Sequence, residues 1–173
     1  MQGFDFYKEF HLLEIDRKNS LDEKVNLPIL ILSILVSVNV FIFSQNSIKE
    51  FLCFYIVIGF LILISIIFSI VFLGKSYSNF FFSHYYKELA VMNDILMYEE
   101  GLTNEGREDK EEIFKNYMKR ELAGCATENF NINKKRTVSL ARCKQSLFIT
   151  LSLTIILALF YVVSLLVNIW ENE

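Results

Sequence analysis

Charged residues are missing from three long stretches of this 173-residue sequence, although they make up 21% of the whole. Proline occurs once, cysteine three times and histidine twice. So little proline and cysteine excludes a collagen-like chain and a disulfide framework, and a hydrophobic content of 53% excludes a disordered chain. The apolar residues gather in long runs, which is typical of a membrane protein.

The three uncharged runs are residues 27–43, 51–73 and 147–170. A helix that crosses a hydrocarbon core of roughly 30 Å needs about 20 apolar residues, because each residue adds about 1.5 Å. The sequence therefore predicts an all-α membrane protein with three transmembrane helices.

The distribution of lysine and arginine predicts the orientation. Residues 1–26 contain four, the loop 44–50 contains one, the region 74–146 contains twelve, and the tail after Trp170 contains none. Because cytoplasmic loops are enriched in lysine and arginine, we expect a cytoplasmic N-terminus, a cytoplasmic region at 74–146 and an external C-terminus. No secretory signal pattern precedes the first run, so we expect the N-terminus to be retained.

Residues 1–26 predict a cytosolic amphipathic helix, with Phe6, Phe10 and Leu13 on one side. A capping-box pattern predicts that a second helix starts near Leu21 and runs into the first span. Two interpretations stay open for the amphipathic segment. It lies on the inner leaflet, or a ring of such helices plugs a pore from below.

The region 74–146 predicts a cytosolic helical hairpin. Apolar residues at helical spacing from Tyr77 to Leu96 predict that the second span continues inward as its first arm. The glycine-containing stretch 101–106 ends this pattern. A second arm begins near Asp109 and runs into the third span, with Gly124 as the only candidate hinge.

Residues 129–146 are basic and contain no acid, and two interpretations stay open for them. Lysine and arginine beside a span hold its orientation and contact anionic lipid. The same cations also suit a phosphate-containing ligand. Asn129, Asn133 and Arg136 share one helix face. A row of two amides and an arginine is not needed to hold the orientation of a span. The candidate ligand-binding residues are Asn129, Asn133, Lys134, Lys135, Arg136 and Arg142.

Polar and small residues recur at helical spacing along the third span. Their default role is close helix packing with hydrogen bonds across the contact. The alternative is that they line a water-filled path in an oligomer. The candidate pore-lining residues are Thr150, Thr154, Ala158, Tyr161, Leu165 and Asn168.

Nothing in the sequence predicts an enzyme. The two histidines are isolated, and the sequence contains no phosphate loop, nucleophile elbow or metal-ligand pattern, so we expect no cofactor and no metal. No aspartate, glutamate, lysine, arginine or histidine lies inside a span, which argues against a pump or an ion-coupled transporter. If anything crosses the membrane through this chain, a passive pore made of several copies is the simplest route.

The stretch Ala126–Arg136, followed by Leu140-Ala-Arg142 and an apolar span, resembles small multi-pass effectors of bacterial anti-phage defence, of the SLATT and Hailong types. Residues 85–96 look similar too. The resemblance implies an oligomeric channel of the bacterial inner membrane, with a tetramer favoured. It also implies control by a nucleotide or DNA oligomer from a companion nucleotidyltransferase. Residues 4–18 would supply the gate, with Phe6, Phe10 and Leu13 as its candidates, and Asn129, Asn133 and Arg136 would sense the signal.

Two other functions stay open. A non-conducting membrane adaptor would dock a soluble partner through the hairpin, with the acidic turn 99–112 as the contact. A holin-like pore is the third option, although the large hairpin would be superfluous for it.

Overall fold

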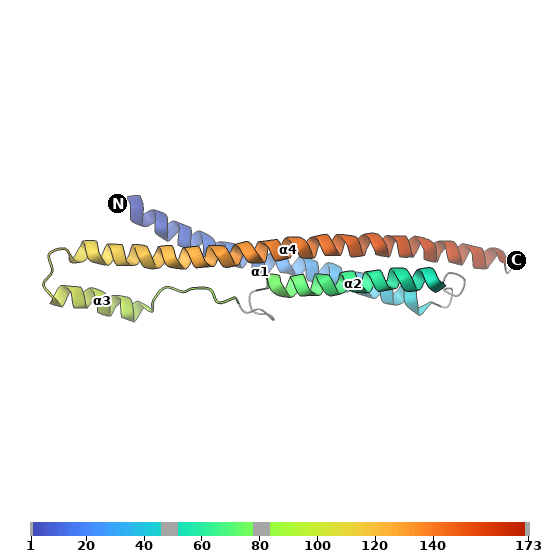
Figure 1. The fold of residues 1–173 in the computed structure, drawn as a ribbon, viewed down its shortest axis with the longest axis horizontal. Helices are drawn as coiled ribbons and strands as arrows, with labels where there is room; N and C mark the ends of the chain where they lie inside the picture. The colour runs from blue at the N-terminus through green and yellow to red at the C-terminus, as the bar shows by residue number, and fades with distance from the viewer. Residues whose placement is uncertain (1, 46–51, 78–83, 172–173) are drawn as a thin grey trace. The chain divides into compact units, whose positions relative to one another are not determined.

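The computed structural model describes residues 2–45, 52–77 and 84–171 (Figure 1). Within these ranges the chain is mostly α-helical and contains no strand. The helices are α1 (Gln2–Ser44), α2 (Leu52–Ser76), α3 (Met92–Asn104) and α4 (Lys110–Glu171). Three of them, α1, α2 and α4, are long and apolar enough to cross a membrane, which confirms this part of the prediction.

The chain divides into two compact units. The first, which we call the hairpin unit, comprises Met1–Leu21 and Ser83–Lys135. The second, the span unit, comprises Asp22–Phe82 and Arg136–Glu173. Each unit therefore combines segments that are far apart in the sequence.

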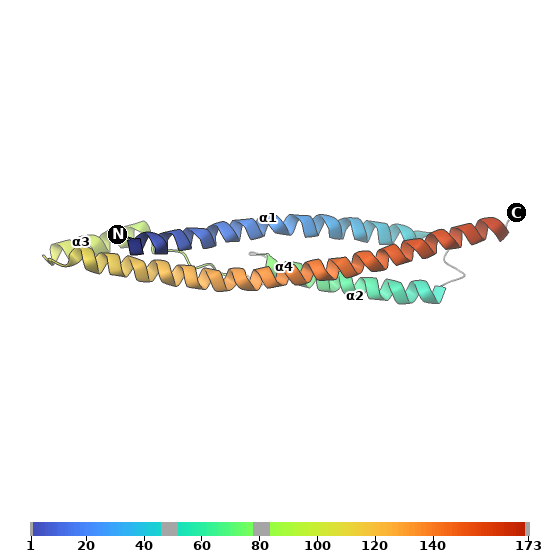
Figure 2. The ribbon, with the colours of Figure 1, turned by 90° about the horizontal axis from the view of Figure 1, so that it is seen from above.

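The span unit packs the C-terminal part of α1, the whole of α2 and the C-terminal part of α4 together (Figure 2). One apolar cluster joins all three helices through Ile42, Ile58 and Leu157. A second cluster joins α1 to α4 through Leu35 and Leu147. Most large apolar side chains of the three helices remain exposed, which suits a surface that faces lipid.

The hairpin unit contains α3 beside the first turns of α4, as both Figure 1 and Figure 2 show. The ring of Tyr98 on α3 lies 4.6 Å from that of Tyr117 and 6.5 Å from that of Phe114, centroid to centroid. The turn that joins α3 to α4 passes through Gly106, whose φ of 65° lies in the left-handed region. Glycine adopts this region without the steric cost that a Cβ atom brings.

The prediction that the second span continues inward as one helix is wrong. The helix α2 ends at Ser76, residues 84–91 are not helical, and helical structure resumes at Met92. Hydrogen bonds from side chains explain the interruption. Lys87 pairs its backbone N–H and carbonyl with the amide of Asn129 instead of with neighbouring turns of a helix.

The helix α1 is unbroken from Gln2 to Ser44, so no new helix starts near Leu21. A capping box begins a helix only where the capping residue leaves the helical conformation. Here residues 20–25 all stay helical, and Leu21 and Val25 are buried as part of the continuing helix. The helix α4 is also continuous and has no break at Gly124, the position that the sequence left open as a hinge. The acidic turn contributes its residues to the end of α3, the connecting turn and the start of α4.

Candidate functional site

Nine buried residues of α4 form one row, which we call the α4 seam. They recur at alternating steps of four and three, the spacing by which helices pack in coiled coils. The polar members of the seam include three of the predicted ligand-binding residues and two of the predicted pore-lining residues. The seam consists of Asn129, Asn133, Arg136, Leu140, Cys143, Leu147, Thr150, Thr154 and Leu157.

In the hairpin unit, the seam holds the 84–91 segment through two buried amides. Asn129 Oδ1 accepts a hydrogen bond from the backbone N–H of Lys87 at 2.9 Å, and Asn129 Nδ2 donates to the carbonyl of Lys87 at 3.1 Å. Asn133 Oδ1 accepts from the hydroxyl of Tyr86 at 2.6 Å. The thiol of Cys125 donates to the carbonyl of Glu88 at 3.4 Å. These bonds satisfy backbone groups that a helix would otherwise pair internally.

The same amide of Asn133 also holds α1. Its Nδ2 lies 2.9 Å from both the carbonyl oxygen and the carboxylate Oε2 of Glu14. Glu14 is 1% exposed, and Arg17 compensates its charge at 3.7 Å. His11 is also buried, and its Nδ1 has no hydrogen-bond partner among the described residues. The inward side of α1 in this unit is therefore polar.

The predicted gate residues lie beside this polar side and remain exposed. Phe6 is 62% exposed and Leu13 is 55% exposed, while Phe10 stacks on Phe6 with the ring centroids 6.3 Å apart. The side of α1 formed by these three residues stays exposed, because Glu14 and its partners occupy the packed side of this segment.

In the span unit, Arg136 is completely buried and is the largest of the fully buried side chains. Its Nη2 forms a hydrogen bond and ion pair with Asp22 of α1. Its Nε donates to the carbonyl of Ser76 at 2.7 Å. Ser76 is the last residue of α2, where carbonyl groups lack partners within the helix and carry partial negative charge. One guanidinium thus joins α1, α2 and α4.

The six predicted ligand-binding residues do not form one open site in the described part of the chain. Asn129, Asn133 and Arg136 are buried and bonded within their own units. The other three cations, Lys134, Lys135 and Arg142, are exposed on α4. The structure therefore gives the buried polar residues a role in packing, and it leaves a ligand role for all six as a prediction.

The threonines predicted to line a pore are buried inside the span unit. Thr150 Oγ1 donates to Ser65 Oγ at 2.8 Å, and Thr154 Oγ1 accepts from Asn39 Nδ2 at 2.9 Å. This is the packing role that the sequence gave as the default. Ala158, Tyr161 and Leu165 are half-buried, and the side chain of Asn168 lies outside the described residues. A pore lined by these residues stays a prediction.

Sequence reasoning missed several residues that hold the units together. Asn39 is the lone amide inside the first apolar run, and a polar residue in that position signals a bond across helices. Glu14 and Asp22 are acids on the α1 faces that pack against α4, but no local pattern identifies their partners. Leu157, rather than Ala158, continues the α4 seam, because the seam keeps its alternating steps into the third span.

Among the described residues, no group of three or more histidine, cysteine, aspartate and glutamate side chains is placed to hold a metal ion. Comparison with protein-family models, with curated proteins and with solved structures finds no match to this chain. The structure is therefore the sole basis for assigning a class to this protein, and it assigns no family. The chain is an all-α protein with three helices long and apolar enough to cross a membrane.

Proposed function

We propose that this chain forms a homo-oligomeric, ion-conducting pore in the bacterial inner membrane and acts as an effector of anti-phage defence. The three long apolar helices support the membrane location, and the absence of aspartate, glutamate, lysine, arginine and histidine from the apolar runs favours a passive route over a pump. The defence role rests on the resemblance of residues 126–142 to membrane effectors. A tetramer is the favoured assembly.

One observation carries the oligomeric pore. Phe6, Phe10 and Leu13 form an exposed apolar row on α1, N-terminal to the first apolar run. The packed side of this helix segment is already occupied by His11 and Glu14. An apolar row that the chain does not cover itself marks an interaction surface. In the proposed pore, equivalent rows from neighbouring copies pack together and close the cytoplasmic entrance.

Control by a nucleotide or DNA oligomer follows from the chemistry of the buried donors. Asn133 donates to the carboxylate of Glu14, and Arg136 donates to the carboxylate of Asp22. Phosphate oxygens are acceptors of the same kind. In the proposed mechanism a polyanion, attracted by the exposed lysines of α4, replaces one of these carboxylates and releases the segment of α1 that it holds.

The test is the membrane potential of bacteria that produce the chain, followed with a potential-sensitive dye. We expect Phe6→Ser, Phe10→Ser and Leu13→Ser together to depolarise cells at lower expression than the parent chain, because the closing contact is lost. The control is Leu12→Ser with Ile15→Ser, on the opposite exposed flank of the same segment. It should behave like the parent chain. If neither the parent chain nor the row variant changes the potential at matched membrane levels, the pore is excluded.

Cross-linking tests the contact itself. In a Cys53→Ser background, Leu13→Cys should give a dimer with a short bismaleimide, whereas Lys8→Cys, exposed on the far side of the helix, should not. The two buried native thiols are expected to stay unreactive. Equal cross-linking at the two positions would contradict packing through the row.

The alternative function is a non-conducting adaptor, and the surface of α3 favours it. Met92 is 78% exposed, Leu96 and Met97 are exposed beside it, and the acidic turn follows directly. A soluble partner with an apolar groove and a basic rim would fit this surface. Capture of such a partner that depends on Met92 and Leu96, together with an unchanged membrane potential, would favour the adaptor over the pore.

A further inference from the structure

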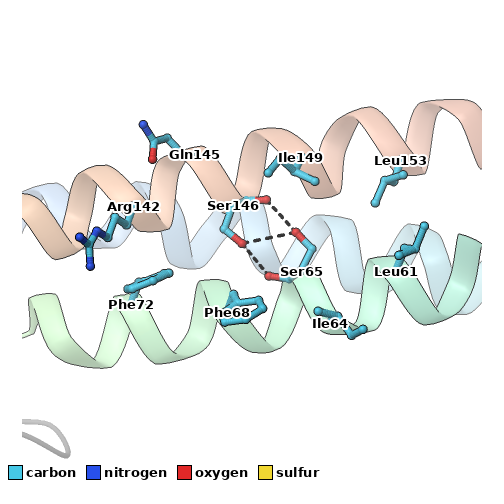
Figure 3. Close-up of a pocket in the computed structure, with 10 residues that line it drawn as sticks. All are labelled: Leu61, Ile64, Ser65, Phe68, Phe72, Arg142, Gln145, Ser146, Ile149 and Leu153. Carbon is cyan, nitrogen blue, oxygen red and sulfur yellow. Dashed lines mark hydrogen bonds between the residues drawn. The ribbon is translucent and has the colours of Figure 1, made fainter.

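A groove of about 610 Å³ runs between α2 and α4 in the span unit (Figure 3). Its walls are large apolar side chains, among them Phe68 and Ile149. Its floor is formed by two small residues, Ser65 and Ser146. Figure 3 shows these serines facing each other at the middle of the groove, with the apolar side chains on either side.

The floor does not require a polar occupant. Ser146 Oγ donates to the carbonyl of Ser65 at 2.8 Å, and Ser65 Oγ donates to the carbonyl of Ser146 at 3.0 Å. Thr150 Oγ1 donates to Ser65 Oγ at 2.8 Å. Because these hydroxyls satisfy one another and the backbone, the hollow between the helices suits an apolar chain.

The two ends of the groove differ in charge. At one end, the guanidinium of Arg142 lies over the ring of Phe72, with Cζ 5.8 Å from the centroid. At the other end, Leu61 and Leu153 are purely apolar. Arg142 makes no hydrogen bond or ion pair with any other described residue. The five N–H donors of its guanidinium are therefore available to an acceptor from outside the chain. Gln145 adds an amide at the same end.

The length of the groove matches one leaflet of a bilayer. From Arg142 to Leu153 the groove follows α4 for about 16 Å, given a rise of about 1.5 Å per residue. Half of a hydrocarbon core is about 15 Å. Arg142 also lies just outside the apolar run that begins at Leu147, which is where a lipid headgroup would lie.

We propose that this groove binds one anionic phospholipid, with an acyl chain along Ser65 and Ser146 and the headgroup phosphate on Arg142. A guanidinium presents paired donors that fit phosphate oxygens, whereas a zwitterionic headgroup adds a cation that Arg142 repels. The site is independent of pore formation, because it uses contacts within a single span unit.

The experiment uses native mass spectrometry of the full chain in detergent, with equal amounts of dioleoyl phosphatidylglycerol and dioleoyl phosphatidylcholine added. We expect the parent chain to retain one phosphatidylglycerol per chain, at least fivefold in preference to phosphatidylcholine. Arg142→Gln should remove that preference. The matched control is Lys144→Gln, an exposed cation outside the groove, and it should keep the preference.

A second pair of variants tests the groove itself. Ile149→Trp fills it and should lower retention of both lipids at least fivefold, whereas Leu151→Trp adds the same bulk to an exposed position outside it. Equal retention of the two lipids by the parent chain, or an unchanged preference in Arg142→Gln, would overturn the proposal. So would weaker association between chains in Ile149→Trp without any change in lipid retention, since that result assigns the groove to a second copy. The membrane potential measured for the pore does not enter this test.

Discussion

Single residues explain how two amides and an arginine can lie buried in this chain. Each polar atom of Asn129 and Asn133 has a partner in the hairpin unit, and Arg136 has a carboxylate and a helix-terminal carbonyl in the span unit. Burial of a polar group is costly unless its bonds are made. The identity of these residues is therefore fixed by partners that lie far away in the sequence.

The first prediction concerns Arg136. Removal of one member of a buried ion pair leaves the other charge without compensation, at a typical cost of 3–5 kcal/mol. Because Asp22 is half-exposed, we expect Arg136→Ala to lower the free energy of unfolding by about 3 kcal/mol, at the lower end of that range. Denaturant titration of the purified chain in detergent measures the change. Arg120→Ala, an exposed cation on the same helix, should stay within about 0.5 kcal/mol of the parent chain.

The second prediction concerns Cys125. Burial raises the pKa of its thiol above the usual value, more than the positive charge of nearby Lys87 lowers it. Because a maleimide reacts with the thiolate, the raised pKa means a smaller reactive fraction at pH 8. We expect labelling of Cys125 to be slow in the folded chain and to become faster as the pH rises. Peptide mass spectrometry measures the labelling, with the denatured chain as the control. Equal rates in the folded and denatured chains would contradict the burial of this thiol.

The sequence indicated part of this residue-level arrangement. The steps of four and three placed Asn129, Asn133 and Arg136 on one face of a helix, and that face is buried. The spacing could not indicate whether a ligand or the chain itself supplies the acceptors. Glu14 and Asp22, more than a hundred positions away along the chain, supply acceptors to Asn133 and Arg136, and the carbonyl of Lys87 supplies one to Asn129. Only the fold brings such residues together.

At the scale of elements, apolar runs predicted the long helices well, and helix ends were harder to predict. An uncharged run must be helical to satisfy its own backbone, so α1, α2 and α4 follow from composition. Residues 84–91 belong to a stretch with helical spacing but adopt another structure, because Asn129 and Cys125 bind their backbone. Periodicity reports how side chains alternate, and it carries no information about competing partners for the backbone.

The third prediction uses two glycines on either side of a helix end. Gly106 has a φ of 65°, so Gly106→Ala should destabilise the chain by about 1 kcal/mol, the cost of a Cβ atom in the left-handed region. Gly101 lies inside α3 with open space around its Cα, so Gly101→Ala should stabilise the chain by about 0.5–1 kcal/mol through helix propensity. Thermal unfolding of the two variants measures both effects. The same sign for both would contradict the position of the turn.

At the scale of the whole molecule, the charge distribution and the apolar helices together predict how the chain lies in a membrane. The twelve lysines and arginines of region 74–146 outnumber those of every other segment, and the tail after Trp170 has none. Exclusion of positive charge from the external side thus favours a cytoplasmic hairpin unit. This orientation determines which compartment the proposed gate faces. It also determines which leaflet contains the proposed lipid groove.

The fourth prediction tests the orientation with single cysteines in a Cys53→Ser background, labelled in spheroplasts by a membrane-impermeant maleimide. Glu173→Cys should be labelled in intact spheroplasts, because the predicted orientation places the tail outside. Glu111→Cys, at the exposed start of α4, should be labelled only after the membrane is opened. The denatured chain is the control that both thiols can react. The reverse pattern would place Arg142 and its groove in the outer leaflet and the row of Phe6, Phe10 and Leu13 on the external side, where a cytoplasmic nucleotide signal could not control it.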